Sequence, residues 1–220
     1  MARRRKMYRF EQNREADNVI ERGKPIYSTI KGHWLSDYFK NTNPIVLELG
    51  CGKGEYTVGL AQAYPERNFI GIDIKGDRIA RGSQAALDAN LANVAFLRTD
   101  VQYLLEFFGE HEVDEIWITF PDPQPRDKQE KHRLTYASFL ALYRSILKPD
   151  GLLHLKTDHS PFFEYSLSTL PQNGFIILAS TTDLYQSALN DIHLGIKTKY
   201  EGMFFAKGFS INYLQSQKAG

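Results

Sequence analysis

Residues 45–64 read IVLELGCGKGEYTVGLAQAY, and this stretch decides the fold. Its first five residues form a nearly continuous apolar run, which is typical of a strand buried on both faces of a parallel sheet. The loop 50–54 contains three glycines, and residues 55–64 have the pattern of a helix that Pro65 ends. A strand, a glycine loop and a helix in this order predict the first unit of an α/β sheet.

Strands and helices continue to alternate beyond this unit. Apolar or alternating runs predict further strands over 68–74, 94–97, 116–120, 152–156, 175–179 and 203–214. Helices are expected over 76–91, 101–108, from a cap at Thr135 to about 147, and over 161–170. This order predicts a sandwich of helices around a mostly parallel seven-stranded sheet with an antiparallel last strand. Residues 1–30 are polar and basic, so we expect a basic N-terminal arm followed by a single domain over 31–220.

Composition excludes several classes of protein. The 220 residues include 27 basic and 26 acidic ones, and no apolar run approaches the ~18 residues of a membrane span. The basic start has no apolar segment behind it, as a secretory signal would. One cysteine, Cys51, cannot form an internal disulfide, which suits the cytoplasm, and no zinc-ligand spacing occurs. Residues 1–10 contain five basic residues and no acidic one, which leaves 22 basic and 26 acidic residues in 11–220.

Acidic residues lie near the ends of five predicted strands. They are Glu48, Asp73, Asp100, Asp122 and Asp158. Ligands of open parallel sheets bind outside the carboxyl ends of the strands, so these acids predict an electronegative crevice that favours a cation. An acid at a strand end is also a common helix N-cap, and clustered carboxylates also suit magnesium. A magnesium site would leave the glycine loop without a role, so we expect no metal.

The glycine loop favours S-adenosylmethionine over a dinucleotide. A dinucleotide site needs a third glycine where Glu55 stands, and Glu48 would lie close to a pyrophosphate. S-adenosylmethionine has no phosphate and carries a sulfonium and an ammonium. The protein backbone can approach such a ligand closely at Gly50 and Gly52. In this interpretation Asp73 accepts hydrogen bonds from the ribose diol and Asp100 from the adenine amino group.

A stiff loop with a basic flank follows the fourth predicted strand. Three prolines within 121–125 restrict the backbone around Asp122. Arg126, Lys128, Lys131 and Arg133 follow within eight residues, diluted by two acids. Such a flank is either an ordinary solvated loop or a surface that contacts nucleic-acid phosphates beside a catalytic pocket.

Six motifs occur in order along the chain: Glu48-Leu-Gly-Cys-Gly-Lys-Gly-Glu55, Gly71-Ile-Asp-Ile74, Phe120-Pro-Asp-Pro123, Leu147-Lys-Pro-Asp-Gly151, Lys156-Thr-Asp158 and Thr198-Lys-Tyr-Glu201. Together they resemble the bacterial tRNA (guanine-N7)-methyltransferase family, over roughly residues 44–205. The Pro-Asp-Pro loop and the late Thr-Lys-Tyr-Glu segment are specific to it. The resemblance implies a Rossmann-like class I methyltransferase fold, S-adenosylmethionine as donor, and tRNA, at its variable loop, as substrate.

The resemblance also implies roles for individual residues. The donor would be bound by Glu48, Gly50, Gly52, Asp73, Asp100 and Asp122. Asp122, beside donor and guanine, would also be the catalytic acid. The substrate would be bound by Arg126, Asp158, Thr198, Lys199, Tyr200 and Glu201. RNA would be contacted by Lys128, Lys131, His132 and Arg133. The chain departs from the family at Gln124, where a tryptophan is usual, and in a less basic downstream stretch.

Guanine N7 carries a lone pair and no proton, so methylation there needs no general base. Placement governs the in-line displacement, and a fixed carboxylate can stabilise the charge that develops on the ring. Asp122 or Asp158 could do this, or could instead orient the base; we assign the catalytic role to Asp122 because its loop is stiffer. Three alternatives remain: a class I methyltransferase acting on a small molecule or a protein, a non-catalytic RNA-binding protein, and a nucleotide-dependent oxidoreductase.

Overall fold

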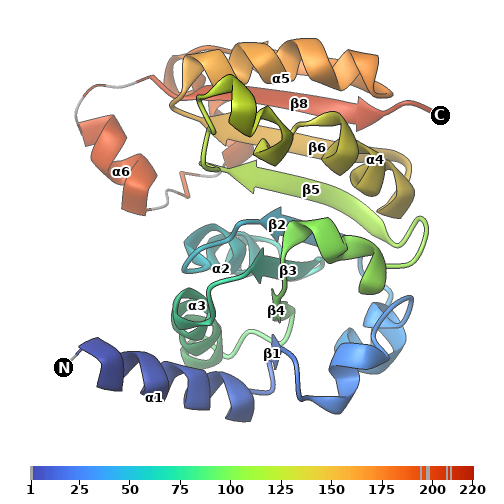
Figure 1. The fold of residues 1–220 in the computed structure, drawn as a ribbon, viewed down its shortest axis with the longest axis vertical. Helices are drawn as coiled ribbons and strands as arrows, with labels where there is room; N and C mark the ends of the chain where they lie inside the picture. Colours follow the sequence, from blue (N-terminus) through green and yellow to red (C-terminus); the bar gives the residue numbers. More distant parts are fainter. Residues whose placement is uncertain (1, 194, 197–198, 207, 209) are drawn as a thin grey trace. The chain divides into compact units, whose positions relative to one another are not determined.

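The computed structural model describes residues 2–193, 195–196, 199–206, 208 and 210–220 (Figure 1). The chain divides into two compact units, Met1–Gly109 and Glu110–Gly220. The fold is α/β: among the described residues, each unit contains four neighbouring strands of a mostly parallel sheet. This confirms the predicted fold class. The boundary between the units falls inside the segment 31–220 for which we expected a single domain.

The first unit carries the glycine loop. Its elements, where η marks a short 3₁₀ or π helix, are α1 (Ala2–Glu15), β1 (Val19–Ile20), η1 (Pro25–Ser28), η2 (Trp34–Phe39), β2 (Ile45–Leu49), α2 (Glu55–Ala63), β3 (Asn68–Asp73), α3 (Gly76–Asp88), β4 (Val94–Arg98) and η3 (Val101–Glu106). The strands lie in the order β1-β4-β3-β2, all parallel. Every residue of β2 and of β3 is buried, as expected for parallel strands covered on both faces.

The N-terminal segment belongs to this packing. Val19 and Ile20 are at most 1% exposed and pair with Phe96 and Leu97 of β4. Helix α1 packs on α3 (Figure 1). The sequence did not indicate β1 because two residues are too few for a strand pattern. With β1, the described part of the chain contains eight strands, one more than the seven predicted. Within the expected arm 1–30, therefore, at least residues 19 and 20 are part of the sheet.

The second unit carries the Pro-Asp-Pro loop. Its elements are β5 (Val113–Thr119), η4 (Asp127–His132), α4 (Ala137–Ile146), β6 (Leu147–Thr157), α5 (Ser160–Gln172), β7 (Phe175–Thr181), η5 (Leu184–Gln186), η6 (Asn190–His193), α6 (Lys199–Ala206) and β8 (Asn212–Lys218). The strand order is β5-β6-β8-β7. Strands β5 and β6 are parallel, while β8 is antiparallel to both of its neighbours, which confirms the antiparallel last strand.

Two local predictions in this unit were wrong. The expected strand over 203–214 is divided: residues 203–206 end helix α6, and the strand is Asn212–Lys218. Gly208, at φ 75°, lies between the two elements. The expected cap residue Thr135 does not cap α4, whose N-cap is Tyr136 without a side-chain cap bond. The Thr135 hydroxyl is buried and lies 2.8 Å from the Ser166 hydroxyl of α5, so it joins two helices instead.

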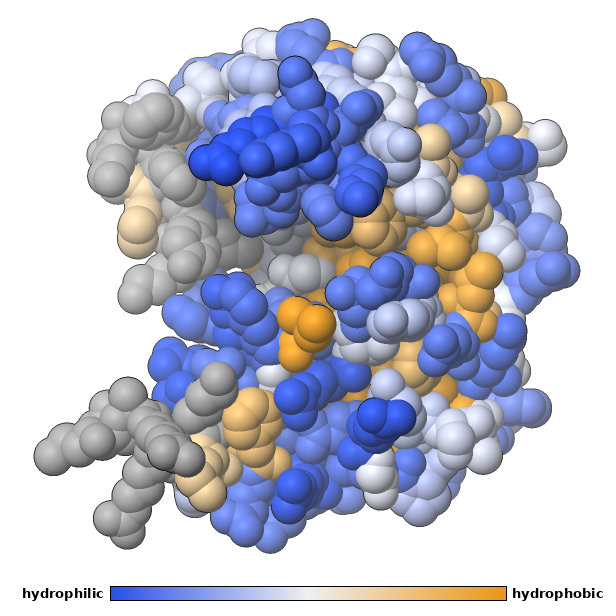
Figure 2. All heavy atoms as spheres, in the orientation of Figure 1, coloured by the Kyte–Doolittle hydropathy of each residue, from blue (hydrophilic) through white to orange (hydrophobic). Residues whose placement is uncertain are grey.

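Apolar side chains fill the core of each unit, and hydrophilic residues cover most of the face drawn in Figure 2. Within the described residues, no helix is long and apolar enough to cross a membrane.

Candidate active site

The glycine loop between β2 and α2 is fixed by close packing. Gly54 has φ 70°, and a Cβ there would lie 2.6 Å from the Phe96 ring. Gly82 of α3 faces the same ring, and a Cβ at this position would lie 2.7 Å from the carbonyl oxygen of Lys53. The loop therefore lies directly against α3. This contact explains the glycine in the middle of that helix.

Alanine at Gly82 is expected to lower the free energy of unfolding by about 2 kcal/mol, because its Cβ meets backbone that cannot easily move. Alanine at Gly202 is the matched control, because this residue lies in helix α6 and a Cβ there would meet no atom within 4 Å. That change is expected to be neutral or to stabilise by up to about 1 kcal/mol. Urea unfolding of both variants measures the difference. A Gly82→Ala protein as stable as the wild type would contradict this packing.

Glu48 holds the start of α2 from inside the sheet. Its side chain is 4% exposed, and Oε2 accepts hydrogen bonds from the Thr57 amide at 2.9 Å and from the Thr57 hydroxyl. The helix N-cap is Gly54, which has no side chain to cap with. The Glu48 carboxylate thus serves an unsatisfied amide at the positive end of the helix.

Asp73, at the end of β3, connects two loops. Its Oδ2 accepts from the Gly52 amide at 2.9 Å, and its Oδ1 accepts from the Lys75 amide at 2.8 Å. The carboxylate is 8% exposed. Burial raises the pKa of the neighbouring Cys51 thiol well above its usual value, and the carboxylates of Glu48 and Asp73 raise it further. The thiol is therefore neutral at pH 7.

Asp100 behaves as an ordinary N-cap. Its Oδ1 accepts from the Gln102 amide at 3.1 Å at the start of η3. From the sequence, each strand-end acid could have a purely structural role as a helix N-cap, and Asp100 has that role. Its Oδ2 makes no hydrogen bond within the described residues.

Asp122 lies exposed in a constrained loop after β5. The flanking Phe120 and Gln124 both have φ 48°, in the left-handed region. The Phe120 amide donates to the Lys156 carbonyl at 2.9 Å, and the Gln124 carbonyl accepts from Arg133 Nε at 3.2 Å. Both sides of the loop are thereby tied to other segments. Among the residues that the structure describes, the Asp122 side chain makes only a long contact, 3.4 Å from the Gln124 amide.

The basic residues after this loop divide into two groups. Arg126, Lys128, Lys131 and His132 are exposed. Arg133 is half-buried, with its guanidinium 4.4 Å from the centre of the Tyr165 ring, so it supports the loop at Gln124. The exposed group forms a basic surface on and beside η4.

Asp158 follows β6 and does not cap α5. The cap is His159, whose Nδ1 accepts from the Phe162 amide at 3.1 Å. Asp158 is half-buried and forms no hydrogen bond with other described residues. Its carboxylate is therefore available to a ligand.

Glu201, which the sequence assigned to substrate, lies in a buried ion pair. Its Oε1 is 2.6 Å from Lys156 Nζ, and both side chains are 0% exposed. The Tyr185 hydroxyl donates to the same oxygen at 2.6 Å. Burial, with the nearby carboxylate, raises the pKa of Tyr185. Thr198 lies outside the described residues, and of Lys199 and Tyr200 only the helical backbone is described.

The sequence interpretation gave no individual role to three residues around these sites. Lys156 and Tyr185 hold Glu201, and a lysine inside the apolar run of β6 was the available signal. Ile74 follows Asp73 and is 58% exposed, an apolar side chain beside the glycine loop. Across the described ranges, no three His, Cys, Asp or Glu side chains come together as a metal-ligand set.

Comparison with known proteins identifies the family. A family model described as a putative methyltransferase matches residues 42–214. A tRNA (guanine-N(7)-)-methyltransferase of Christiangramia forsetii is 46% identical over 220 residues, covering 98% of each chain. A protein of the same name from Geobacillus kaustophilus is 41% identical over 84% of this chain and 83% of its own.

Solved structures agree at the level of the fold. The 16S rRNA methyltransferase KamB superposes with a TM-score of 0.66 at 13% identity, covering 92% of this chain and 99% of its own. At that identity the likeness shows the fold alone. The sequence identities and the family model go further: the chain belongs to the tRNA (guanine-N7)-methyltransferase family.

Proposed function

We propose that this protein transfers a methyl group from S-adenosylmethionine to N7 of a guanine in tRNA, at the variable loop. The observation that carries the proposal is the 46% identity over 98% of the chain to a relative of that name. The family model spans 42–214 and so includes both the glycine loop and the Pro-Asp-Pro loop. Methylation of tRNA also implies that the protein acts in the cytoplasm.

The first unit fits a methyl donor of this kind. When bound, S-adenosylmethionine supplies a methyl group already activated on a sulfonium. Each oxygen of Asp73 accepts one backbone amide and keeps a lone pair for a ribose hydroxyl. The buried carboxyl group of Glu48 suits a cationic donor, and Gly50 and Gly52 allow close approach of the loop. Asp100 Oδ2 would accept a hydrogen bond from the adenine amino group, and the exposed Ile74 side chain would pack against the face of the adenine ring.

In the second unit, Asp122 is assigned to the reacting base. Guanine N7 attacks without losing a proton, so the protein has only to place the base and stabilise the positive charge that develops on it. Asp122 is held by a loop anchored on both sides and its carboxylate has no strong hydrogen bond to give up. Asp158 would orient the base through its N1–H and amino group.

The exposed residues Arg126, Lys128, Lys131 and His132 are assigned to the tRNA backbone. Phosphate contacts position an RNA and carry no sequence information directly. Arg133 would contribute indirectly, because its hydrogen bond to the Gln124 carbonyl holds the loop that carries Asp122. The family motif assigns Thr198, Lys199 and Tyr200 to the substrate. Glu201 fixes helix α6 through its ion pair with Lys156.

Incubation of the purified protein with methyl-labelled donor and bulk tRNA tests the proposal. We expect label in the tRNA fraction that disappears when the RNA is digested. Label found only on proteins or small molecules would favour the alternative methyltransferase classes. Donor and tRNA binding without transfer would indicate an RNA-binding protein that retains the fold.

A further inference from the structure

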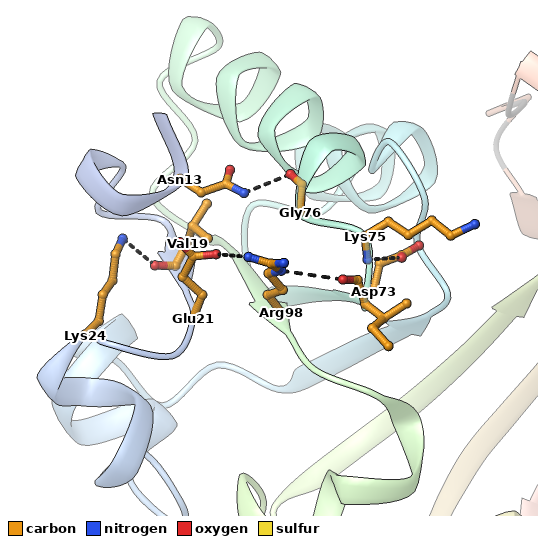
Figure 3. A network of polar contacts seen from close by, with 9 residues as sticks. Asn13, Val19, Glu21, Lys24, Asp73, Lys75, Gly76 and Arg98 are labelled. Carbon is orange, nitrogen blue, oxygen red and sulfur yellow. Dashed lines mark hydrogen bonds and ion pairs between the residues drawn. The ribbon is translucent and has the colours of Figure 1, made fainter. Parts of the chain in front are cut away.

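Arg98, the last residue of β4, lies beside the turn that presents Asp73 (Figure 3). In the parallel pairing of β3 with β4, Asp73 and Arg98 are register partners at the ends of their strands. Arg98 Nε donates to the carbonyl oxygen of Ile74 at 3.5 Å. The guanidinium therefore lies along the turn 73–76, which connects β3 to α3.

The N-terminal segment holds this guanidinium. Glu21 comes directly after β1, the strand that pairs with β4, and is 5% exposed. Its Oε2 lies 3.0 Å from Arg98 Nη1. Phe10 of α1 covers the guanidinium, with 4.7 Å between its ring centre and Arg98 Cζ. Arg98 is thus held by an ion pair and an aromatic ring that both come from the first 21 residues.

Helix α1 contacts the same turn a second time. Asn13 is fully buried, and its Nδ2 donates to the Gly76 carbonyl at 2.8 Å (Figure 3). A Cβ at Gly76 would lie 2.7 Å from the Phe10 ring and 3.0 Å from Arg98 Cζ. Helix, guanidinium and turn are therefore packed so tightly that a larger residue at 76 would separate them.

These contacts lie on either side of the amide that orients Asp73. Lys75 donates its amide to Asp73 Oδ1, the carbonyl of the preceding Ile74 accepts from Arg98, and the carbonyl of the following Gly76 accepts from Asn13. We propose that Arg98 is a positioning residue for donor binding, and that α1, through Phe10 and Asn13, holds Arg98 and the turn 73–76 in place. This inference rests on the proposed assignment of Asp73 to the methyl donor.

The test is the dissociation constant of S-adenosylmethionine, measured by calorimetry on the full chain. Arg98→Met is expected to weaken donor binding about tenfold and to leave the tRNA dissociation constant unchanged, because the hydrogen bond to the Ile74 carbonyl and the ion pair with Glu21 are lost. Arg98→Lys keeps a cation for Glu21 but loses the planar group, so about threefold is expected. Arg67, which lies over Tyr64 at 5.1 Å in the same unit, supplies the control: Arg67→Met is expected to change donor binding less than about twofold.

Equal donor affinity in wild type, Arg98→Met and Arg98→Lys would overturn the inference. If Arg98→Met does not fold, donor affinity is measured in Arg98→Lys and Phe10→Leu instead. Wild-type donor affinity in both variants would equally overturn the inference. A selective loss of donor affinity that lysine partly restores would support positioning, since a general loss of structure would weaken tRNA binding too. A wild-type protein that binds donor but methylates no tRNA would refute the proposed function alone, and one that binds no donor would refute both.

Discussion

Asparagine in place of Asp122 is expected to lower the rate of methyl transfer at saturating donor by at least about 100-fold. Asparagine has nearly the same shape as aspartate, so the loop should keep its conformation. What is removed is the negative charge that would face the methylated guanine. Single-turnover transfer to tRNA, with donor affinity measured on the same preparation, separates these effects.

Asp127 provides the matched control for this change. It is an exposed aspartate five residues further on, at the start of η4. Asp127→Asn removes the same charge from the same basic stretch, and is expected to leave the single-turnover rate within about twofold because no reacting group is assigned there. Near-full activity in Asp122→Asn would show that the catalytic assignment is wrong and would direct attention to Asp158.

Breaking the buried pair of Lys156 and Glu201 is expected to cost about 3–5 kcal/mol of unfolding free energy. Both side chains are fully buried, and their charged atoms are 2.6 Å apart. Glu201→Gln preserves size but leaves the ammonium of Lys156 in the core without its counter-charge. In Lys156→Met, the Glu201 carboxylate loses the ammonium but keeps the hydrogen bond from the Tyr185 hydroxyl. Urea unfolding measures the loss in each variant.

The double variant Lys156→Met with Glu201→Leu isolates the charge. Replacing both members of a buried pair by apolar residues is often neutral, so this protein should be markedly more stable than either single variant. If the two single changes cost less than about 1 kcal/mol each, the pair is solvated and does not fix α6. If the double variant loses as much as the singles together, packing and not charge is what the pair contributes.

The sequence predicted the strands of the first unit well because their signal is local. Strands β2 and β3 are mostly apolar, and burial on both faces makes such runs the rule for parallel strands. Strand β8 was misplaced because its second half, Gln215–Lys218, is polar. The polar groups of this half have partners that are distant in the sequence. Strand β8 pairs with β6 and β7, and Lys218 Nζ donates to the Leu147 carbonyl at 2.8 Å. Such pairing leaves no local pattern.

The same distinction holds at the site. Spacing alone indicated Asp73, because acids at the ends of parallel strands share one edge of a sheet. The role of Arg98 could not be read in this way. Its partners Phe10, Asn13 and Glu21 are distant in the sequence, on a helix and beside a two-residue strand whose pairing with β4 has no sequence signature. Glu201 was assigned to the substrate by the family resemblance alone, and no sequence signal pairs it with Lys156, far earlier in the chain.

Mapping of the modified base in tRNA treated with the wild-type protein and S-adenosylmethionine tests the central claim most directly. The nucleoside digest, resolved by mass spectrometry against a tRNA substrate that lacks the modification, is expected to contain 7-methylguanosine at one position in the variable loop. A methyl group on another atom of guanine, on another base, or on no nucleoside at all would contradict the account.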